Sequence, residues 1–476
     1  MISGLYLITD DNQDGHLLTR VSAALRGGVR IVQYRAKNLS GEDRRTNAVK
    51  LRELCREHQA LLIINDLPEL ARDIDADGVH LGQDDMPLVD ARRIVGHDKL
   101  IGISTHNVDE ALKAEGQGAD YVAIGSLFPT ASKTDITLVG LSMLRRVRKA
   151  VRIPVVGIGG MTPERAFGAI DAGADAVAVM AGIMGDENPA RAAREYALLF
   201  NRKEPYPKGR VLTIAGSDSG GGAGIQADIK TITLLGSYAT SVLTALTAQN
   251  TTGVTAIHNV DTSFVAAQLD AVLDDIGTDT VKTGMLNWGG IVRRVGKTIA
   301  ERQLLAVVDP VMVAKGGASL LNEEAQDSLI SHLLPQAYLL TPNLPEISVL
   351  TGILPQTVEE MVEAGRALQS LGVRNVLIKG GHLQQDATDV LLMDDDRHLL
   401  TSARVNSRNT HGTGCTLSAA IATFLAQGYP LKQAVEKGKH FITIAIEQAV
   451  AIGRGHGPVN HFQAAMQLLH EQSPMD

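Results

Sequence analysis

The strongest chemical signal in the chain is a small-residue run at positions 409–416, which reads NTHGTGCT. An apolar segment with helical spacing, residues 417–425, follows it directly. Glycines allow successive backbone N–H groups to converge on one point, and a helix that begins there adds its positive end. Such a run is an anion hole, suited to the charge that develops on a transferring phosphoryl group. A Gly-rich loop that only turns the chain into a helix would look the same, so the run alone leaves both interpretations open.

Length and composition limit the classes of protein to which the chain can belong. Its 476 residues exceed one ordinary hydrophobic core, so we expect two or three domains. Hydrophobic residues make up 44% and charged residues 21%, which is typical of a globular α/β protein. The net charge of −8 and the lack of a Lys/Arg-rich run argue against nucleic-acid and membrane partners.

The cysteines and the apolar segments indicate a location. Cys55 and Cys415 are too few for a disulfide framework or a zinc site, and they suit a reducing compartment. Residues 1–7 lack a basic region and a long apolar core, so we expect no signal peptide. No apolar run reaches the ~18 residues of a membrane-spanning helix. We therefore expect a cytoplasmic protein, and a homo-oligomer remains open.

The first 200 residues alternate short apolar strands with longer amphipathic segments such as 42–58 and 141–150. The expected strands are 5–9, 30–34, 61–64, 78–81, 100–103, 121–124, 154–157 and 176–179. This βαβα order requires a parallel sheet, and eight units in about 200 residues predict a TIM (β/α)8 barrel. An open doubly wound sheet would show the same alternation, but rarely with so many repeats.

Functional residues of a TIM barrel lie at the carboxyl ends of its strands. Gln33, Arg35 and Lys37 follow the second expected strand at spacing i, i+2, i+4. We expect all three side chains to point into the mouth of the barrel and to form a polyphosphate clamp. A solvated strand end with one ion pair is the alternative.

Carboxylates follow the next two strands. Asn65 and Asp66 end the third strand, and Asp84 and Asp85 come after the fourth. Carboxylates of adjacent strands can share one Mg²⁺, which prefers oxygen ligands and leaves positions for phosphate. Helix N-capping by these aspartates is the alternative.

The remaining strand ends carry small and hydroxyl residues. Ser104 follows the fifth strand and the run FPTASK, residues 128–133, follows the sixth. The runs GIGG at 157–160 and MAGI at 180–183 end the seventh and eighth strands, where barrels commonly hold a single phosphate on backbone N–H groups. One mouth with a diphosphate site and a phosphate site suggests an enzyme that joins two phosphorylated small molecules.

These strand ends, taken in order, resemble thiamine-phosphate synthase. The match covers roughly residues 4–198 and rests on QYRAK at 33–37, the Asn65–Asp66 pair, Asp85, Ser104, FPTASK and GIGG. The resemblance implies that Asp66 and Asp85 carry Mg²⁺. It implies that an aminopyrimidine diphosphate is bound by Gln33, Arg35, Lys37, Asn65, Ser104 and Lys133. It also implies that a thiazole phosphate is bound by Thr130, Ser132, Gly160, Met180 and Ala181.

The chemistry that this resemblance implies is loss of diphosphate to leave a pyrimidinylmethyl cation, which the thiazole nitrogen then captures. Arg35 and Lys133 would be catalytic because, with Mg²⁺, they stabilise charge on the departing diphosphate. Ala181 departs from the family pattern, in which a Ser is expected; a backbone N–H contact would survive that change. The related thiazole tautomerase is an alternative, although the clamp and the Asp66–Asp85 pair argue against it.

A second α/β domain is expected after a short linker. Residues 201–210 are polar, contain two prolines and lack periodicity, so we predict domains at 1–200 and 211–476. Expected strands at 211–215, 306–308, 337–340 and 376–378, with helices from 225 and at 358–371, predict a mostly parallel sheet. The loop GSDSGGGAG at 216–224 lacks the Lys of a Walker A motif.

The second domain resembles the ribokinase superfamily, and within it hydroxymethylpyrimidine (phosphate) kinase. The match runs from about 211 to 462 and rests on residues 215–228, 244–251, 341–346 and 409–416. It implies a pyrimidine pocket lined by Gly216, Asp218, Ala223, Thr247, Gln249 and Met285. It implies that ATP and Mg²⁺ are bound by Asn343, Lys379, Thr413 and Gly414, with Glu346 for the metal.

Cys415 stands where many ribokinase relatives have an Asp that acts as general base. A thiolate could take the proton of the substrate hydroxyl if the helix N-terminus depresses its pKa. A small residue at a helix start is the alternative. Residues 315–317, Lys-Gly-Gly, fit either a mobile lid or a surface turn.

Together the two resemblances imply a bifunctional enzyme of thiamine biosynthesis, because the kinase would make the diphosphate that the barrel consumes. ATP would be the phosphoryl donor, and the partners would be small-molecule substrates. Pyridoxal kinase is an alternative for the second domain. A barrel that only senses thiazole phosphate for the kinase is an alternative of a different class.

Overall fold

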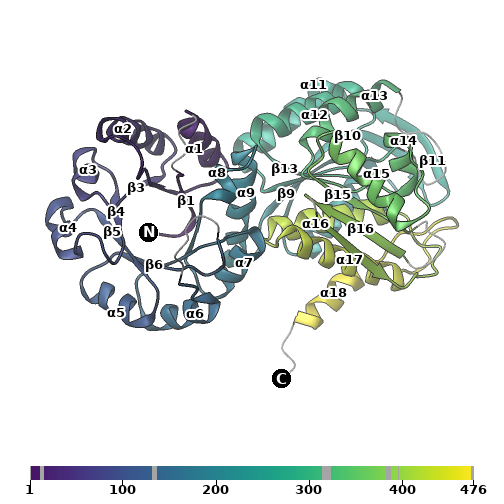
Figure 1. The fold of residues 1–476 in the computed structure, drawn as a ribbon. Helices are drawn as coiled ribbons and strands as arrows, with labels where there is room; N and C mark the ends of the chain where they lie inside the picture. Colours follow the sequence, from purple (N-terminus) through teal and green to yellow (C-terminus); the bar gives the residue numbers. More distant parts are fainter. Residues whose placement is uncertain are drawn as a thin grey trace. The chain divides into compact units, whose positions relative to one another are not determined.

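The computed structural model describes residues 2–10, 15–130, 137–312, 323–381, 387–394 and 396–472. The chain divides into two compact units, Met1–Phe200 and Asn201–Asp476. Figure 1 shows a ring of strands in the first unit and a layered sheet in the second.

The first unit is a closed barrel of eight parallel strands, in which β1 pairs with both β2 and β8. The strands are β1 (Gly4–Ile8), β2 (Ile31–Tyr34), β3 (Leu61–Asn65), β4 (Gly78–Leu81), β5 (Leu100–Thr105), β6 (Tyr121–Ile124), β7 (Val155–Ile158) and β8 (Ala176–Val179). The predicted TIM barrel is confirmed, and the closing β1–β8 pair excludes the open doubly wound sheet.

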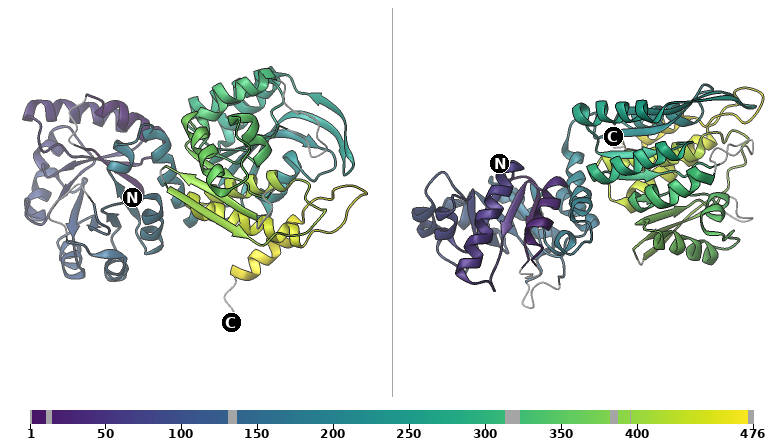
Figure 2. Two further views of the ribbon diagram at one scale, coloured as in Figure 1. Left: turned by 45° about the vertical axis from the view of Figure 1, so that its right-hand side comes forward. Right: turned by 90° about the horizontal axis from the view of Figure 1, so that it is seen from above.

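Helices surround this barrel, as the end-on view of Figure 1 and the side view of Figure 2 show. Several begin at side-chain caps: Ser40, Asn107 and Thr162 each accept a backbone N–H three residues on. The helices are α1 (Leu17–Arg26), α2 (Gly41–Glu57), α3 (Pro68–Asp73), α4 (Leu88–Val95), α5 (Val108–Gly116), α6 (Gly140–Ala150), α7 (Pro163–Asp171), α8 (Ala181–Met184) and α9 (Pro189–Leu198).

The barrel has two apolar layers, because alternate strand residues face opposite sides. One layer, which includes Leu51, Val79 and Leu144, packs between the strands and the helices. The other lies inside the barrel and includes Ile63, Val156 and two tyrosines, Tyr6 and Tyr121. The phenols of this inner layer place polar atoms in an otherwise apolar interior.

The second unit contains a nine-stranded sheet in the order β11-β10-β9-β12-β13-β14-β15-β16-β17. Six central strands are parallel, while β11 at one edge and β16 and β17 at the other are antiparallel. The strands are β9 (Arg210–Asp218), β10 (Tyr238–Asn250), β11 (Gly253–Asn259), β12 (Thr280–Thr283), β13 (Leu305–Val308), β14 (Leu339–Leu340), β15 (Asn375–Ile378), β16 (Ala387–Met393) and β17 (Asp396–Ser402). The predicted mostly parallel sheet is confirmed.

Helices cover both faces of this sheet, with α11 and α12 on one side and α16 and α17 on the other in Figure 1. α16 packs against β9, β12, β13, α10 and α17, and it is therefore buried from Thr416 to Ala426. The α-helices are α10 (Gly224–Leu234), α11 (Thr262–Ala271), α12 (Gly289–Arg302), α13 (Glu323–Ser328), α14 (Leu344–Thr351), α15 (Val358–Ser370), α16 (Thr413–Ala426), α17 (Leu431–Glu447) and α18 (His461–Gln472). Among the helices that the structure describes, none has the length and apolarity needed to cross a membrane.

The segment expected to be a linker is bonded to the second unit. A short 3-10 turn, η1 (Leu199–Lys203), begins it. Asn201 Nδ2 donates to Ala426 O over 2.8 Å, and the Lys208 N–H donates to Gly236 O over 2.9 Å. These bonds restrict residues 201–208 more than the composition of the segment suggested.

Candidate active sites

The strand-end carboxylates of the barrel meet, as their positions on adjacent strands implied. Lys37 Nζ lies 3.2 Å from Asp66 Oδ2. Asp66 also contacts the Asp85 carboxyl; burial first, and then this contact, raises the pKa of Asp66, while Lys37 opposes the rise. Asp85 Oδ2 accepts the Gly82 N–H over 2.6 Å, which fixes the turn after β4.

A hollow adjoins Lys37 and Asp66, between the segments that follow β2 and β3. Lys37, Asn65 and Asp66 line it, as do Tyr34 and Arg44. Arg44, which lies in the first turn of α2, was not among the site residues predicted from the sequence. Its position could have been anticipated only from the folded loop.

Gln33 is bonded into the barrel interior. Gln33 lies within β2 with only 4% of its surface exposed, and its Nε2 donates to Tyr6 Oη over 2.8 Å. Arg35 and Lys37 come after the strand ends at Tyr34, so strand alternation no longer aligns them with Gln33. Gln33 therefore lies in the barrel interior, whereas Lys37 lies beside Asp66 at the end of the neighbouring strand.

Ser104 lies in β5 and is bonded into the barrel interior. His80 Nε2 lies 2.9 Å from Ser104 Oγ. The sequence predicts His80, Tyr6 and Tyr121 only as residues of apolar strands. No local pattern marks them, because the bonds that join them span up to 115 residues.

The loops expected to bind the thiazole phosphate pack against each other. Gly160 has a φ of +60°, and a Cβ there would lie 2.3 Å from Pro129 O. Arg165 Nη1 donates to Gly160 O over 2.7 Å, and its guanidinium stacks on Phe128 at 5.2 Å. Met180 and Ala181 begin α8 at the end of β8. Thr130 is described, whereas Ser132 and Lys133 lie outside the described residues.

In the second unit, two Gly-rich loops approach so closely that side chains are excluded. Gly412 has a φ of +79°, and a Cβ on it would lie 1.7 Å from Gly222 O. α16 begins at the next residue, so the positive end of the helix lies beside this contact. The run at 409–416 and the loop at 216–224 therefore form one wall.

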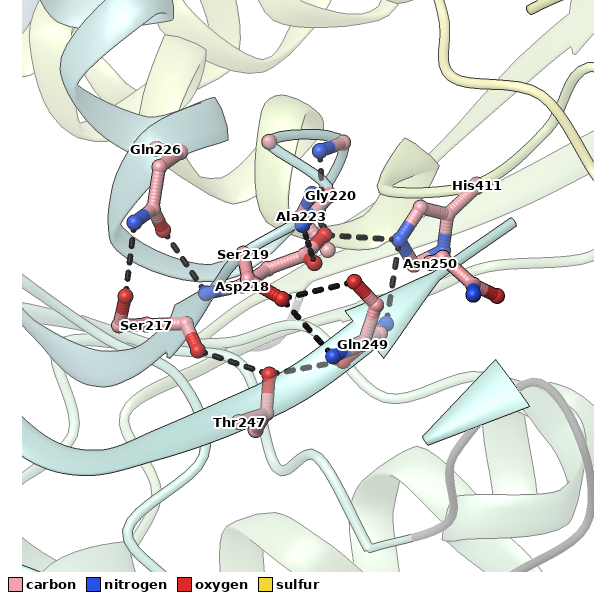
Figure 3. Close-up of polar contacts among 12 residues, drawn as sticks. Ser217, Asp218, Ser219, Gly220, Ala223, Gln226, Thr247, Gln249, Asn250 and His411 are labelled. Carbon is pink, nitrogen blue, oxygen red and sulfur yellow. Dashed lines mark hydrogen bonds and ion pairs between the residues drawn. The ribbon is translucent and has the colours of Figure 1, made fainter. Parts of the chain in front are cut away.

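Asp218 organises the first of these loops (Figure 3). Its carboxylate accepts the N–H groups of Gly220, Gly222 and Ala223 at 2.8, 3.0 and 2.8 Å. His411 Nε2 lies 2.9 Å from Asp218 Oδ2. Burial alone would raise the pKa of Asp218, but the hydrogen bonds from His411, Ala223 and Gly220 lower it. The carboxylate of Asp218 therefore shapes the pocket that it was expected to line.

The other expected pocket residues gather at the carboxyl ends of β9 and β10. Thr247 Oγ1 donates to Ser217 O over 2.9 Å, and Gln249 Nε2 lies 3.3 Å from His411 Nε2 (Figure 3). Met285 Cε would lie 2.4 Å from a Cβ on Gly216, so Met285 covers that glycine. His411 belongs to the 409–416 motif, and its contact with Asp218 adds it to the site residues that the sequence predicts.

A cluster of charged residues lies beside the start of α16. Lys379 Nζ is 2.9 Å from Asp309 Oδ1 and 3.9 Å from Glu346 Oε2. A Cβ on Gly414 would lie 3.2 Å from Asp309 and 3.4 Å from Lys379, which places the anion hole against this cluster. Asp309 follows β13 directly, and that position could have identified it as a site residue.

Asn343 and Glu346 form the capping box of α14. Asn343 N–H donates to Glu346 Oε2 and Glu346 N–H donates to Asn343 Oδ1, both over 2.8 Å. Burial raises the pKa of Glu346 to about 7; Lys379 opposes the rise and Asp309 adds to it. The two residues expected to bind ATP and Mg²⁺ are thus held rigidly by each other.

The pKa of the Cys415 thiol differs from the expected one. Burial raises the pKa of its thiol to about 11, although the Lys282 ammonium and the Gly224 N–H act in the opposite direction. The expectation of a depressed pKa at the helix N-terminus is therefore wrong. Behind Cys415, Lys282 and Asp228 form a 2.8 Å ion pair in which both side chains are fully buried.

In the part of the chain that the structure describes, no group of three or more His, Cys, Asp or Glu side chains could hold a metal ion. A divalent cation would therefore be bound by one or two carboxylates of the protein. Mg²⁺ commonly takes one or two protein carboxylates and completes its shell with water and substrate phosphates. The contact between Asp66 and Asp85 fits this pattern. Glu346, beside a Lys and an anion hole, fits a site that shares its metal with a nucleotide.

Comparison with known proteins supports the family resemblance of each of the two units. Residues 5–183 match the thiamine monophosphate synthase family, and residues 218–460 match the phosphomethylpyrimidine kinase family. The thiamine biosynthesis bifunctional protein ThiED of Geobacter sulfurreducens is 53% identical over 98% of this chain and 95% of its own length. The hydroxymethylpyrimidine/phosphomethylpyrimidine kinase of Haemophilus influenzae is 48% identical over 53% of this chain and 96% of its own.

A solved structure agrees with the fold of the second unit. The Bacillus subtilis pyridoxal kinase in complex with ADP aligns with a TM-score of 0.51 and 40% identity, covering 55% of this chain and 99% of that one. The resemblances found in the sequence are thereby confirmed at the level of family. The chain belongs to the bifunctional thiamine biosynthesis proteins, in which a thiamine monophosphate synthase domain precedes a phosphomethylpyrimidine kinase domain.

Proposed function

We propose that the two domains catalyse consecutive reactions. The kinase domain phosphorylates 4-amino-5-hydroxymethyl-2-methylpyrimidine and then its monophosphate, with ATP as donor. The barrel couples the resulting pyrimidine diphosphate to thiazole phosphate, which yields thiamine phosphate and diphosphate. The observation that carries the proposal is the meeting of Gly412 with Gly222 beside the Lys379–Asp309–Glu346 cluster, since an anion hole next to a buried cation suits phosphoryl transfer.

In the kinase reaction, the pyrimidine lies against Gly216, Met285 and Ala223, and Gln249 pairs with its aminopyrimidine edge through an amide donor and acceptor. Asp218 and Thr247 hold the walls of this pocket through the bonds described above. The hydroxymethyl group then faces the first turn of α16, where the N–H groups of Thr413 and Gly414 donate hydrogen bonds to the phosphoryl oxygens.

Lys379, Asn343 and Glu346 are proposed to position ATP. Lys379 neutralises phosphate charge, while the capping box holds Glu346 in place for a metal. Mg²⁺, when bound, supplies neutralisation of the phosphate charge that develops during transfer. Cys415 is proposed as the acceptor of the substrate proton, which requires the small thiolate fraction that a pKa of about 11 allows.

In the barrel reaction, departure of diphosphate leaves a pyrimidinylmethyl cation that the thiazole nitrogen captures. Arg35, Lys37 and Lys133 stabilise the departing diphosphate, and Asn65 and Ser104 orient the substrate. Asp66 and Asp85 would hold Mg²⁺, which supplies further charge neutralisation when bound. Thr130, Ser132, Gly160, Met180 and Ala181 bind the thiazole phosphate.

Mass spectrometry of the purified protein with hydroxymethylpyrimidine, thiazole phosphate and Mg·ATP tests both reactions together. We expect thiamine phosphate to form. Accumulation of pyrimidine diphosphate alone would leave a kinase attached to a sensor domain, and absence of any phosphorylated pyrimidine would refute the role of residues 409–416.

Two further assays separate the alternatives. Asp66→Asn should abolish most of the coupling of pyrimidine diphosphate to thiazole phosphate while phosphorylation continues. If the barrel were only a sensor, the wild-type protein would show no coupling, and the substitution would change nothing in this assay. Pyridoxal in place of hydroxymethylpyrimidine should be a poor substrate. A pyridoxal rate equal to that of hydroxymethylpyrimidine would favour the pyridoxal kinase alternative that the structural comparison raises.

A further inference from the structure

A continuous chain of hydrogen bonds crosses the interior of the barrel. Gln33 Nε2 donates to Tyr6 Oη over 2.8 Å, and Tyr6 Oη lies 3.0 Å from Tyr121 Oη. His80 continues the chain, with Nδ1 at 3.1 Å from Tyr121 Oη and Nε2 at 2.9 Å from Ser104 Oγ. The first four members are each 7% exposed or less. The chain, which we call the relay, therefore connects β2 to β5 through residues of β1, β6 and β4.

The backbone is shaped to admit this relay. Gly102 in β5 lies against the Tyr121 ring so closely that a Cβ would come within 2.0 Å of Tyr121 Cζ. The His80 ring lies 5.6 Å from the Tyr121 ring, tilted by 30°. Any side chain at position 102 would displace the phenol that links the two halves of the relay.

With Gln33 Nε2 as the donor to Tyr6, the relay has one direction when every buried donor is satisfied. Burial raises the pKa of Tyr6 and of Tyr121, so each phenol keeps its proton. Since Tyr6 accepts from Gln33, its own proton goes to Tyr121, and the Tyr121 proton goes to His80 Nδ1. A neutral imidazole that accepts at Nδ1 carries its hydrogen on Nε2, which then donates to Ser104 Oγ.

With Gln33 donating at one end, every other arrangement leaves a buried hydroxyl proton without an acceptor, and such a proton is costly. The two ends of the relay are therefore opposite in kind. Gln33 has its Oε1 acceptor left for a ligand, and Ser104 has its O–H donor left.

We propose that the relay makes Gln33 an acceptor and Ser104 a donor toward the pyrimidine ring, so that Tyr6, Tyr121 and His80 are positioning residues for substrate choice. This inference rests on the proposed function, which places Ser104 on the pyrimidine diphosphate, and on the resemblance to thiamine-phosphate synthase, which implies the same of Gln33. An aminopyrimidine offers the matching pattern of an exocyclic N–H donor and a ring-nitrogen acceptor. Its 4-oxo analogue offers a carbonyl acceptor and a ring N–H donor, so the relay selects against the analogue.

Tyr121→Phe and Tyr6→Phe test the proposal, because each removes one oxygen from the relay and frees the Gln33 amide to rotate. We expect the kcat/KM preference for the 4-amino over the 4-oxo pyrimidine diphosphate to fall about tenfold, which corresponds to the loss of one oriented hydrogen bond. The change should lie in KM, since neither phenol touches the leaving group.

Thr105→Val is the matched control. Thr105 is next to Ser104 on β5 and is buried, and its hydroxyl donates to Ala123 O over 3.1 Å, outside the relay. Its removal should leave the amino-to-oxo preference unchanged. Thermal unfolding of each variant verifies that the barrel remains folded.

The direction of the relay can be measured without substrate. In the full-length protein labelled with ¹⁵N-histidine, and with His80 assigned by its absence in His80→Gln, we expect the Nε2-protonated tautomer. An Nδ1-protonated His80 would overturn the proposed direction. Unchanged preference in both Tyr variants of a protein that couples normally would overturn the role in substrate choice. No coupling by the wild-type protein would instead refute the proposed function, and the tautomer would still decide the direction of the relay.

Discussion

The two proposed sites place their charges at different depths. In the barrel, the side chains of Lys37 and Asp66 are 54% and 24% exposed, and the hydrogen-bonded interior side chains are two phenols, an amide and an imidazole. In the kinase domain, the side chains of Lys379 and Asp309 are 16% and 3% exposed, and those of Lys282 and Asp228 are fully buried. The barrel keeps charge at its rim, whereas the kinase domain keeps charge in its interior.

This difference matches the two reactions. A departing diphosphate ends in water, so exposed cations at a rim can stabilise it and then release it. A phosphoryl group that passes from ATP to an alcohol must be kept from water, because hydrolysis would compete with transfer. Buried charges are stronger in that drier environment, but they make the fold depend on the pairing of each charge.

The largest expected effect follows from breaking the buried pair of the kinase domain. Lys282→Met leaves the buried Asp228 carboxyl without its cation, which should lower the free energy of unfolding by about 3–5 kcal/mol. Fluorescence of Trp288, the single tryptophan of the chain, reports this unit during denaturant unfolding. The double variant Lys282→Met/Asp228→Leu should regain much of the loss, because no unpaired charge remains.

A surface pair provides the control for that experiment. Lys297 and Glu301 lie 3.6 Å apart with both side chains more than half exposed. Lys297→Met should change the free energy of unfolding by less than about 0.5 kcal/mol. If Lys282→Met cost no more than Lys297→Met, buried charge would not distinguish this domain from the barrel.

The next effect separates the two activities. Gly412→Ala should lower the kcat of pyrimidine phosphorylation about 100-fold, the loss typical for one misplaced oxyanion donor, because its Cβ would collide with Gly222 O. Coupling of supplied pyrimidine diphosphate to thiazole phosphate should not change. Both rates are measured on the same preparation.

Gly352→Ala is the control for backbone strain alone. Gly352 has a φ of +75°, close to that of Gly412, but nothing lies within 4 Å of a Cβ at that position. This variant should lose some stability and keep its phosphorylation rate. Equal damage from both substitutions would show that strain, and not the closeness of the two loops, controls the activity.

The smallest expected effect is a difference in pH dependence between the two reactions. Phosphorylation requires transfer of the substrate proton, whereas coupling in the barrel proceeds by capture of a cation. Only a deprotonated Cys415 can accept the substrate proton, and its pKa of about 11 lies above the assay range. The thiolate fraction therefore rises with pH, so phosphorylation should speed up by about tenfold per pH unit between 7.5 and 9. Coupling in the barrel uses no general base and should stay nearly constant. A flat phosphorylation profile, or the same slope in Cys415→Ser, would remove Cys415 from the role of base.

The barrel strands were predictable because each is a short apolar run between polar helices. The strands 78–81, 121–124 and 176–179 were found at the same residues in the structure as in the sequence. Strand-end carboxylates such as Asp66 and Asp85 could also be paired in advance, because adjacent parallel strands end at one edge. β12 was missed because its residues, Thr280–Thr283, are mostly polar although all four are buried.

Contacts between distant residues could not be predicted from local patterns. Gln33, Arg35 and Lys37 were expected to point into the mouth together because their spacing assumed that the strand continues, whereas β2 ends at Tyr34. Tyr6 and Tyr121 look like core residues until their phenols are seen to meet. The ionisation of Cys415 depends on its burial and on the charges around it, among them Lys282, which no motif at 409–416 reveals.

The closeness of Gly222 to Gly412 also has a meaning for synthesis of the chain. The two loops that form the wall of the kinase site are 190 residues apart, so the wall cannot exist until residue 412 has left the ribosome. The barrel is complete by residue 200, and domains generally fold in order as they emerge. A growing chain would thus have its coupling domain folded well before it could make the substrate of that domain. A ribosome stalled before residue 412 would therefore display a barrel without any phosphorylating activity.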